Sequence, residues 1–352
     1  MKVKVKKYYY ENFRLIFESL TVIMIFSSLI ISIALIQIIT SEEFIGGSTE
    51  KMGYSFGLFL SILAGIILIY GSYIQPRRIK ITRINVHNPY SETPLTIAFL
   101  SDFHFGPYKS DNFGLRLTKL VNELTPDIII LGGDYICTKN EEAKHIQSLK
   151  GLKPRIGIYA VMGNHDYIGV YMPINRYPKK EQPKILNKAI KGNKRVQELL
   201  LEIKAKVIDG KQLLIEDHKL NIIGLKERYI QTSPNEVARK AVTDMSKEGY
   251  FNLLISHNPD VIKSDPLKKV QLILSGHTHG GQIRLPIIGS IYPIPTETKK
   301  NYTHGIYTIE SHENQKTEEQ ASPNFIISEG LGESGPRARL FSTPEIILIN
   351  LN

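Results

Sequence analysis

The sequence predicts a mixed α/β domain that follows two membrane-spanning helices. Three observations support this prediction: two long uncharged apolar stretches early in the chain, an alternation of short apolar runs with amphipathic patterns after them, and Asp, Asn or His residues directly after five of these runs. The chain has 352 residues, of which 42% are hydrophobic. It can therefore bury a sizeable core in one large domain or two ordinary ones.

The two apolar stretches are residues 19–39 and 54–74, and neither contains a charged residue. Each has the length of roughly 20 residues that a helix needs to cross a bilayer. A secretory signal usually has a shorter apolar core, and here a second span follows after a short loop. The sequence therefore predicts a membrane anchor over residues 1–78 and a second domain over residues 79–352, with an in-plane or re-entrant hairpin as the alternative.

Basic residues on both flanks predict the orientation of this anchor. They are Lys2, Lys4, Lys6, Lys7 and Arg14 before the first span, and Arg77, Arg78, Lys80 and Arg83 after the second. The loop between the spans is acidic. Because positive flanks stay in the cytoplasm, we expect insertion in the inner (cytoplasmic) membrane with the large domain on the cytoplasmic face.

Part of the net charge of +10 comes from residues 167–197, where eight basic residues accompany the single acid Glu181. Beside a membrane anchor, such a segment is expected to face anionic headgroups or an anionic substrate rather than nucleic acid, or to be a solvated loop. The apolar residues at 167–174 would form a lid for acyl chains or pack beneath this segment. The only cysteine, Cys137, excludes an internal disulfide and a thiolate metal cage.

After the spans, short apolar runs alternate with helical patterns, which favours an α/β domain. Strands are expected at residues 96–100, 128–131, 156–161, 220–224, 251–256 and 270–275, and helices at residues 111–124 and 193–206. From residue 281 onward, strands follow turns, at residues 283–285, 306–309, 325–328 and 345–350, with a polar loop at 311–322. A β-rich second half packed against the first sheet is the simplest arrangement.

Five of the runs are followed directly by blocks of residues that can bind metal ions. The blocks are Ser101-Asp102-Phe103-His104, Gly132-Gly133-Asp134, Gly163-Asn164-His165-Asp166, Ser256-His257-Asn258 and Gly276-His277-Thr278-His279. Alone, each block would usually be a turn or a capped loop. Five blocks in order, each at a strand end, instead predict that their side chains meet at one edge of the domain.

Together the blocks offer seven donors: Asp102, His104, Asp134, Asn164, His257, His277 and His279. Residues two apart on an extended chain share a face, which applies to Asp102 with His104 and to His277 with His279. A pair of divalent ions about 3.5 to 4 Å apart needs a bridging carboxylate. Asp134 is the candidate bridge, because the two glycines before it allow a sharp turn.

Carboxylate, amide and imidazole donors without sulfur suit Mn, Fe, Zn or Co better than Ca or Cu(I). We therefore expect two divalent ions, and the donor types leave the choice among Mn, Fe, Zn and Co open. A water shared by two such ions loses a proton near neutral pH and can attack phosphorus. His165 is outside the ligand count and is a candidate to face the developing charge or the leaving group. Asp166 would then hold the His165 imidazole in one tautomer.

The ordered blocks resemble those of the calcineurin-like metallophosphoesterases, over residues 94–351. This resemblance implies a double β-sheet sandwich flanked by helices, with a dimetal centre at the strand ends. It also implies that Asp102, His104, Asp134 and His279 hold one ion and that Asp134, Asn164, His257 and His277 hold the other. His165 would face the scissile phosphate. Arg284, Arg337 and Arg339 are candidates either for phosphate contacts or for surface roles.

Residues 280–286 and the tail at 330–346 resemble the membrane-associated YkuE/YaeI-type branch, which includes enzymes similar to the chlamydia-type UDP-2,3-diacylglucosamine diphosphatase of lipid A synthesis. This implies a hydrolase that releases UMP and 2,3-diacylglucosamine 1-phosphate. Other lipid A diphosphatases have Arg at the position of His165, so their residue roles do not transfer there. The alternatives are a phosphodiesterase or phosphatase acting on another phospholipid or a soluble ester, and a metal-binding scaffold without catalysis. The expected partners are membrane lipids and a lipid-linked nucleotide, without an obligate protein partner.

Overall fold

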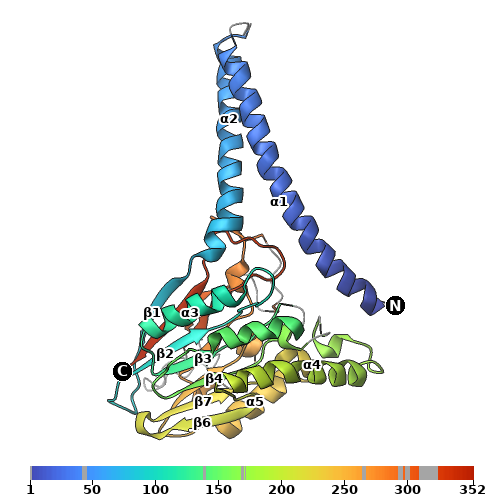
Figure 1. Ribbon diagram of the computed structural model, residues 1–352. Coiled ribbons are helices and arrows are strands. Elements are labelled where there is room, and N and C mark those ends of the chain that lie inside the picture. The colour runs from blue at the N-terminus through green and yellow to red at the C-terminus, as the bar shows by residue number, and fades with distance from the viewer. Residues whose placement is uncertain are drawn as a thin grey trace, which may run out of the picture.

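A computed structural model describes residues 2–41, 46–137, 140–167, 170, 172–263, 267–291, 296–297, 302–308 and 324–352, with side chains from residue 15 onward. Two long helices form a hairpin that projects from a domain built on two β-sheets (Figure 1). The expected polar loop at residues 311–322 lies outside the described residues. The α/β class and the paired sheets are confirmed.

The first sheet has six strands in the order β1-β14-β2-β3-β4-β5. Their bounds are Lys80–Val86, Glu345–Leu351, Leu95–Leu100, Ile128–Leu131, Gly157–Ala160 and Ala205–Val207. Strands β2 to β5 are parallel to one another, whereas β14 is antiparallel to β2 and parallel to β1. Because neighbouring parallel strands end at the same edge, the loops after β2, β3 and β4 begin side by side.

The second sheet has the order β12-β13-β9-β8-β7-β6. The bounds are Gly305–Thr308, Asn324–Ile327, Leu272–Ser275, Phe251–Ile255, Leu220–Gly224 and Lys211–Ile215. Strands β13, β9, β8 and β7 are parallel to their neighbours, and the edge strands β12 and β6 are antiparallel. A separate two-stranded ribbon joins β10 (Arg284–Leu285) to β11 (Gly289–Ser290). The loops after β8 and β9 therefore also begin at one edge.

Apolar side chains form one layer between the sheets and one layer outside each of them. Fully buried residues of both sheets, such as Phe99 and Leu253, meet in the middle layer. Outside the first sheet pack α3 (Asp111–Glu123) and α4 (Gln182–Glu202), and outside the second packs α5 (Pro234–Met245) (Figure 1). Strands buried on both faces explain the continuous apolar runs in the sequence.

The hairpin consists of α1 (Lys2–Thr40) and α2 (Ser48–Ile69), and α2 continues through a π-helical segment (Tyr70–Ile74) and a 3-10 turn (Gln75–Arg77). Its apolar stretches, Leu15–Thr40 and Ser48–Arg77, are long enough to cross a membrane and are almost entirely exposed, which confirms two helices apolar enough to span. Small residues pack the two helices together, since the hydroxyls of Ser28 and Ser61 each donate to the carbonyl of the other. A buried core helix would not expose such a surface.

The helix predicted at residues 193–206 is wrong at both ends. The structure starts α4 at Gln182, ends it at Glu202 and places Ala205–Val207 in β5. Lys204 takes a left-handed conformation, with φ of 63°, which turns the chain into the strand. Most of the basic segment is therefore one face of a helix rather than a loop. The apolar residues Tyr167, Val170 and Ile174 before it are buried, as packing beneath the segment requires, so these three do not form a lid.

The turn that links the two sheets contains a carboxylate with a displaced pKa. Asp209 lies between β5 and β6 and accepts hydrogen bonds from the Met162 amide (3.0 Å) and the Tyr167 hydroxyl (3.3 Å). Burial raises the pKa of Asp209 to about 7, although both hydrogen bonds oppose the rise. In the unfolded chain this carboxyl ionises near pH 4.

We expect Asp209→Asn to be more stable than the parent protein near pH 8 and no more stable near pH 4. Between these values the unfolded parent loses a proton that its folded state keeps, so its free energy of unfolding falls as pH rises towards 7 and is then constant. Asparagine has no such proton. Thermal unfolding of both proteins from pH 4.5 to 8 measures the difference, which should grow to a few degrees. A difference independent of pH would contradict this assignment.

Candidate metal centre

The strand-end loops of both sheets bring the predicted ligands to one edge of the domain. Asp102 and His104 follow β2, Asp134 follows β3 and Asn164 follows β4, all in the first sheet. The second sheet contributes the three remaining ligands, His257 after β8 and His277 and His279 after β9. Every one of the seven side chains belongs to a residue at most 8% exposed. The predicted convergence is therefore present in the structure.

Four of these side chains form a first cluster: Asp102, His104, Asp134 and His279. Each offers one ligand atom, and these atoms lie within 4.8 Å of one another. The Nε2 atoms of His104 and His279 are 3.0 Å apart, and His104 Nε2 is 3.5 Å from Asp134 Oδ2. Asp102 Oδ1 lies 3.6 Å from His279 Nε2. This set has the size of a single ion's coordination sphere.

A second cluster shares Asp134 and adds His257 and His277. The Nε2 atom of His257 is 3.2 Å from Asp134 Oδ2. The amide oxygen of Asn164 is buried and has no hydrogen-bond partner in the part of the chain that the structure describes. Asp134 is thus the one carboxylate common to both clusters, which is the position of a bridging ligand.

The donor atoms fit bound cations better than they fit one another. Two imidazole nitrogens facing each other at 3.0 Å repel unless a proton or a cation lies between their lone pairs. Asp102 Oδ2 and His257 Nε2, like the Asn164 oxygen, are buried without a hydrogen bond to any described residue. Leaving buried polar atoms unsatisfied costs roughly 1–3 kcal/mol each. Mixed oxygen and nitrogen donors without sulfur suit Mn, Fe, Zn and Co.

The backbone at the ligands is held in an uncommon conformation. Five of the seven ligands have positive φ: Asp102 (56°), His104 (44°), Asp134 (53°), His277 (72°) and His279 (52°). For residues other than glycine, such conformations cost on the order of 1–3 kcal/mol and persist where the surroundings impose them. They occur here because each strand must end and turn within one or two residues to aim its side chain at the shared edge.

Backbone carbonyls fix the orientation of two imidazoles. His257 Nδ1 donates to the Gly132 carbonyl at 2.8 Å, and His279 Nδ1 donates to the Gly332 carbonyl at 2.9 Å. A carbonyl can only accept, so Nδ1 carries a proton in both rings and Nε2 is the nitrogen turned towards the centre. Gly163 allows the close approach of two loops, since a Cβ atom there would overlap the Asp134 side chain and amide.

The predicted contact between Asp166 and the His165 imidazole is absent. His165 Nδ1 instead lies 2.6 Å from the Cys137 carbonyl, and the His165 ring meets the His104 ring edge-on at 4.6 Å between centroids. The Asp166 carboxylate accepts three backbone N–H groups, from Gly163 (2.8 Å), Asp134 (3.0 Å) and Tyr135 (2.8 Å). Asp166 therefore ties the loop after β3 to the loop after β4.

Burial and mutual charge displace the pKa values of the centre. Burial lowers the pKa of His104 and of His279 well below the ordinary value, and each ring's other imidazole neighbours add to the effect. Burial also opposes charge on His257, but the carboxylates of Asp134 and Asp102 outweigh it and raise that pKa. Burial raises the pKa of Asp102 to about 6. Neutral His104 and His279 are the protonation state that a metal ligand requires.

The order and spacing of these ligands are shared with a known family. Residues 95–281, more than half of the chain, match the calcineurin-like phosphoesterase family. The chain belongs to this family. It is therefore a metal-dependent phosphoester hydrolase with a site that suits two ions.

Relatives match most of this chain. The chain is 26% identical over 326 residues to the UDP-2,3-diacylglucosamine pyrophosphatase LpxG of Chlamydia trachomatis, covering 82% of this chain and 94% of that protein. It is 26% identical over 298 residues to the uncharacterized metallophosphoesterase YkoQ of Bacillus subtilis, covering 82% and 96%. Among solved structures, a dimetal phosphatase from Danio rerio has a TM-score of 0.37 at 10% identity, covering 67% of this chain and 88% of that one.

Some residues around the centre carry no recognisable signal in the sequence. Arg339, considered above for phosphate contact, is fully buried and donates to the carbonyls of Glu329 and Gly332 instead. Gly332 accepts from His279 as well, so Arg339 supports a ligand through a shared carbonyl. The Tyr229 ring packs edge-on against His277 at 5.7 Å. Only the fold brings these residues to the site.

We expect Asp166→Asn to weaken metal binding, because an amide nitrogen would face backbone N–H donors that now bond a carboxylate. Loss of such a supporting group typically lowers metal affinity about 10- to 100-fold. Metal content per chain after dialysis against graded free Mn²⁺ measures the change. Asp217→Asn, an exposed residue given the same substitution, is the matched control. If both variants bound metal with equal affinity, Asp166 would not be a residue that supports the metal centre.

Proposed function

We propose that this chain is a membrane-anchored diphosphatase that hydrolyses UDP-2,3-diacylglucosamine to UMP and 2,3-diacylglucosamine 1-phosphate. The observation that carries this proposal is a two-cluster metal centre on a domain docked directly to the end of two apolar helices. The similarity to the Chlamydia trachomatis pyrophosphatase over 94% of its length supports the substrate class.

In this proposal the two clusters hold two divalent ions. Asp102, His104 and His279 would hold one, Asn164, His257 and His277 would hold the other, and Asp134 would contribute to both. Such a pair supplies Lewis acidity and lowers the pKa of bound water to near neutral. Mn is the proposed metal, and Fe, Zn or Co would fit the same donors. Asp166 acts by positioning the loops that carry Asp134 and Asn164.

His165 is the proposed catalytic group beside the metals. Its Nδ1 donates a hydrogen bond to the Cys137 carbonyl, which fixes the orientation of the ring. Its Nε2 is then available to contact a phosphate oxygen or the leaving group. It is more exposed than any of the seven ligands, as contact with substrate requires. An imidazole here can donate a proton to the departing UMP or lipid phosphate oxygen.

The short connection to the membrane favours a lipid substrate. The helical turns after α2 end at Arg77, and β1 begins at Lys80. The domain also forms hydrogen bonds to this junction. The Arg339 amide donates to the Gly71 carbonyl, and Lys109 Nζ donates to the Pro76 carbonyl. A substrate with two acyl chains keeps its diphosphate at headgroup level. A domain docked there meets it without a long linker.

The proposed location is the inner membrane with the catalytic domain on the cytoplasmic face, since the basic flanks of the hairpin are retained on that side. The proposal needs membrane lipids and a lipid-linked nucleotide as partners, and neither nucleic acid nor an obligate protein partner. Hydrolysis of another phospholipid or of a soluble phosphoester by the same centre is the alternative.

We expect the detergent-solubilised protein, supplied with Mn²⁺, to release UMP from UDP-2,3-diacylglucosamine, and Asp134→Ala to lose this activity by at least 100-fold. The reason is that Asp134 is the only carboxylate common to both clusters. UMP formation measured by chromatography tests this, with Asp217→Ala as the control at an exposed aspartate. Hydrolysis of a generic phosphodiester without UMP release would retain the metal chemistry and reject the lipid substrate.

We expect a green fluorescent protein fused after Asn352 to fluoresce in a bacterial host, and alkaline phosphatase at the same position to be inactive. A cytoplasmic C-terminus folds the first reporter and not the second. Insertion of each reporter in the loop between the two spans should give the opposite pattern. An active phosphatase at the C-terminus would reverse the orientation and remove cytosolic access to the nucleotide.

A further inference from the structure

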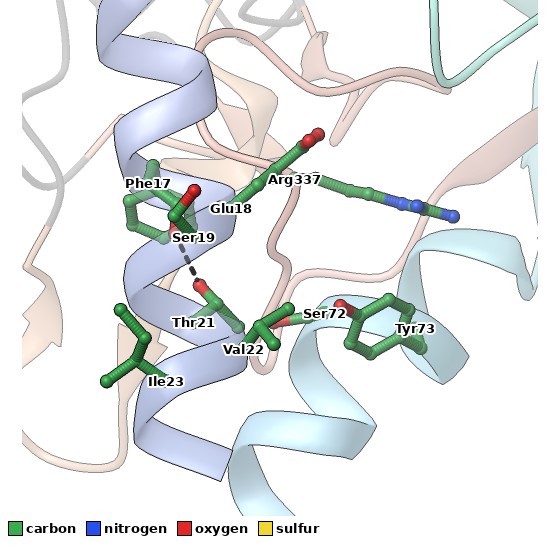
Figure 2. A pocket seen from close by; sticks show the side chains of 9 residues that line it. All are labelled: Phe17, Glu18, Ser19, Thr21, Val22, Ile23, Ser72, Tyr73 and Arg337. Atoms are coloured by element: carbon green, nitrogen blue, oxygen red, sulfur yellow. Dashed lines mark hydrogen bonds between the residues drawn. The ribbon is translucent and has the colours of Figure 1, made fainter. Parts of the chain in front are cut away.

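A cavity of about 400 Å³ lies where the hairpin meets the domain, outside the metal centre. Its walls come from α1, from the π-helical segment that follows α2 and from the loop before β14 (Figure 2). The lining residues are Phe17, Glu18, Ser19, Thr21, Val22, Ile23, Ser72, Tyr73 and Arg337. None of them is a metal ligand. A volume in the range of roughly 300–1,000 Å³ is typical of small-ligand sites.

The depth of the cavity in a membrane follows from the hairpin. The first apolar stretch begins at Leu15, and the second ends at Arg77, so both ends nearest the domain lie at one surface of the bilayer. Residues 17–23 are the first two turns of the first stretch. The cavity is therefore at the boundary between headgroups and acyl chains, with its apolar wall, formed by Val22 and Ile23, on the acyl side.

Arg337 supplies the positive charge of this cavity, and Glu18 supplies a carboxylate on the α1 wall. Its guanidinium lies 5.3 Å from the ring of Tyr73 and 5.0 Å from the ring of Tyr108, and Figure 2 shows it extending past Tyr73 and away from Glu18. Within the described part of the chain, no carboxylate lies within ion-pair distance of it. Stacking on two rings holds the side chain in place and leaves its N–H donors for an anion.

We propose that this cavity binds a bilayer glycerophospholipid, with its phosphate on Arg337 and an acyl chain against Val22 and Ile23. A phosphate matches the planar donors of arginine, and an amphiphile matches a site that is charged at one end and apolar at the other. The occupant is a resident phospholipid rather than a reacting substrate, because the walls contain no residue of the metal centre.

The same loop connects this lipid site to the catalytic edge. The amide of Ser334 and the carbonyl of Pro336 bond the side chain of Gln282, which follows the ligand His279 by three residues. Further back in the loop, the Gly332 carbonyl accepts from His279 itself. A phospholipid bound to Arg337 would therefore stabilise the loop whose Gly332 carbonyl supports the ligand His279.

The experiment is native mass spectrometry of the full chain in detergent, titrated with dioctanoyl phosphatidylglycerol and with dioctanoylglycerol, which lacks the phosphate. We expect one phosphatidylglycerol per chain, with affinity lowered about tenfold or more in Arg337→Gln and less in Arg337→Lys. Dioctanoylglycerol should bind the parent protein and the Arg337→Gln variant with the same weak affinity. Val22→Trp, which fills the cavity without altering Arg337, should also remove the bound lipid.

Arg78→Gln is the matched control, since Arg78 is an exposed arginine at the same membrane surface and does not line the cavity. Equal loss in Arg78→Gln and Arg337→Gln would mean general attraction to the surface and would overturn the proposal. So would unchanged binding in Arg337→Gln. Displacement of phosphatidylglycerol by UDP-2,3-diacylglucosamine would make the cavity a substrate subsite instead. Because the readout is binding, it is independent of whether the protein releases UMP.

Discussion

The convergence of buried donors on Asp134 is the constraint on which the rest of the structure depends. Carboxylate oxygens and imidazole nitrogens are buried within 4.8 Å of one another in each cluster. Without metal ions, this cluster of buried side chains is energetically unfavourable, since several of its polar atoms have neither a hydrogen-bond partner nor an opposite charge. Bound cations would make the same cluster favourable. The fold must therefore hold the donors together before any ion arrives, which requires rigid strands behind every ligand.

Both clusters take ligands from both sheets. His279 from the second sheet completes a cluster that otherwise belongs to the first, and Asp134 from the first completes a cluster with His257 and His277. Each bound ion would thus connect the two layers at the edge where their strands end. The apolar layer between the sheets fixes the distance that the ligands must span, and a cavity in that layer would displace all seven ligands at once. Packing and metal binding are coupled by geometry here.

What the sequence predicts well is local. Apolar strands such as 128–131 are evident because both faces are buried, and ligands at their ends are evident because their spacing is short. Of the edge strands, β12 was predicted, at residues 306–309, whereas β1 and β6 were not. β1 alternates polar and apolar residues, and β6 begins with two exposed polar residues and has only three apolar ones. The start of α4 was missed because its first half is basic. Asp166 was assigned to the wrong partner, since two of its three backbone amide donors belong to the loop after β3 and leave no trace in the sequence near Asp166.

Arg339 illustrates why a tertiary contact can reverse an interpretation. An arginine in the tail of a phosphoesterase suggests phosphate binding, yet this side chain is fully buried among carbonyls, and its own amide donates to the Gly71 carbonyl at the end of the hairpin. One residue thus contacts the membrane anchor through its backbone and, through the Gly332 carbonyl, supports the tautomer of His279. A buried guanidinium is stable only while its acceptors stay in place. Movement of the hairpin relative to the domain would therefore disturb a metal ligand, which makes the anchor a structural part of the centre rather than a tether.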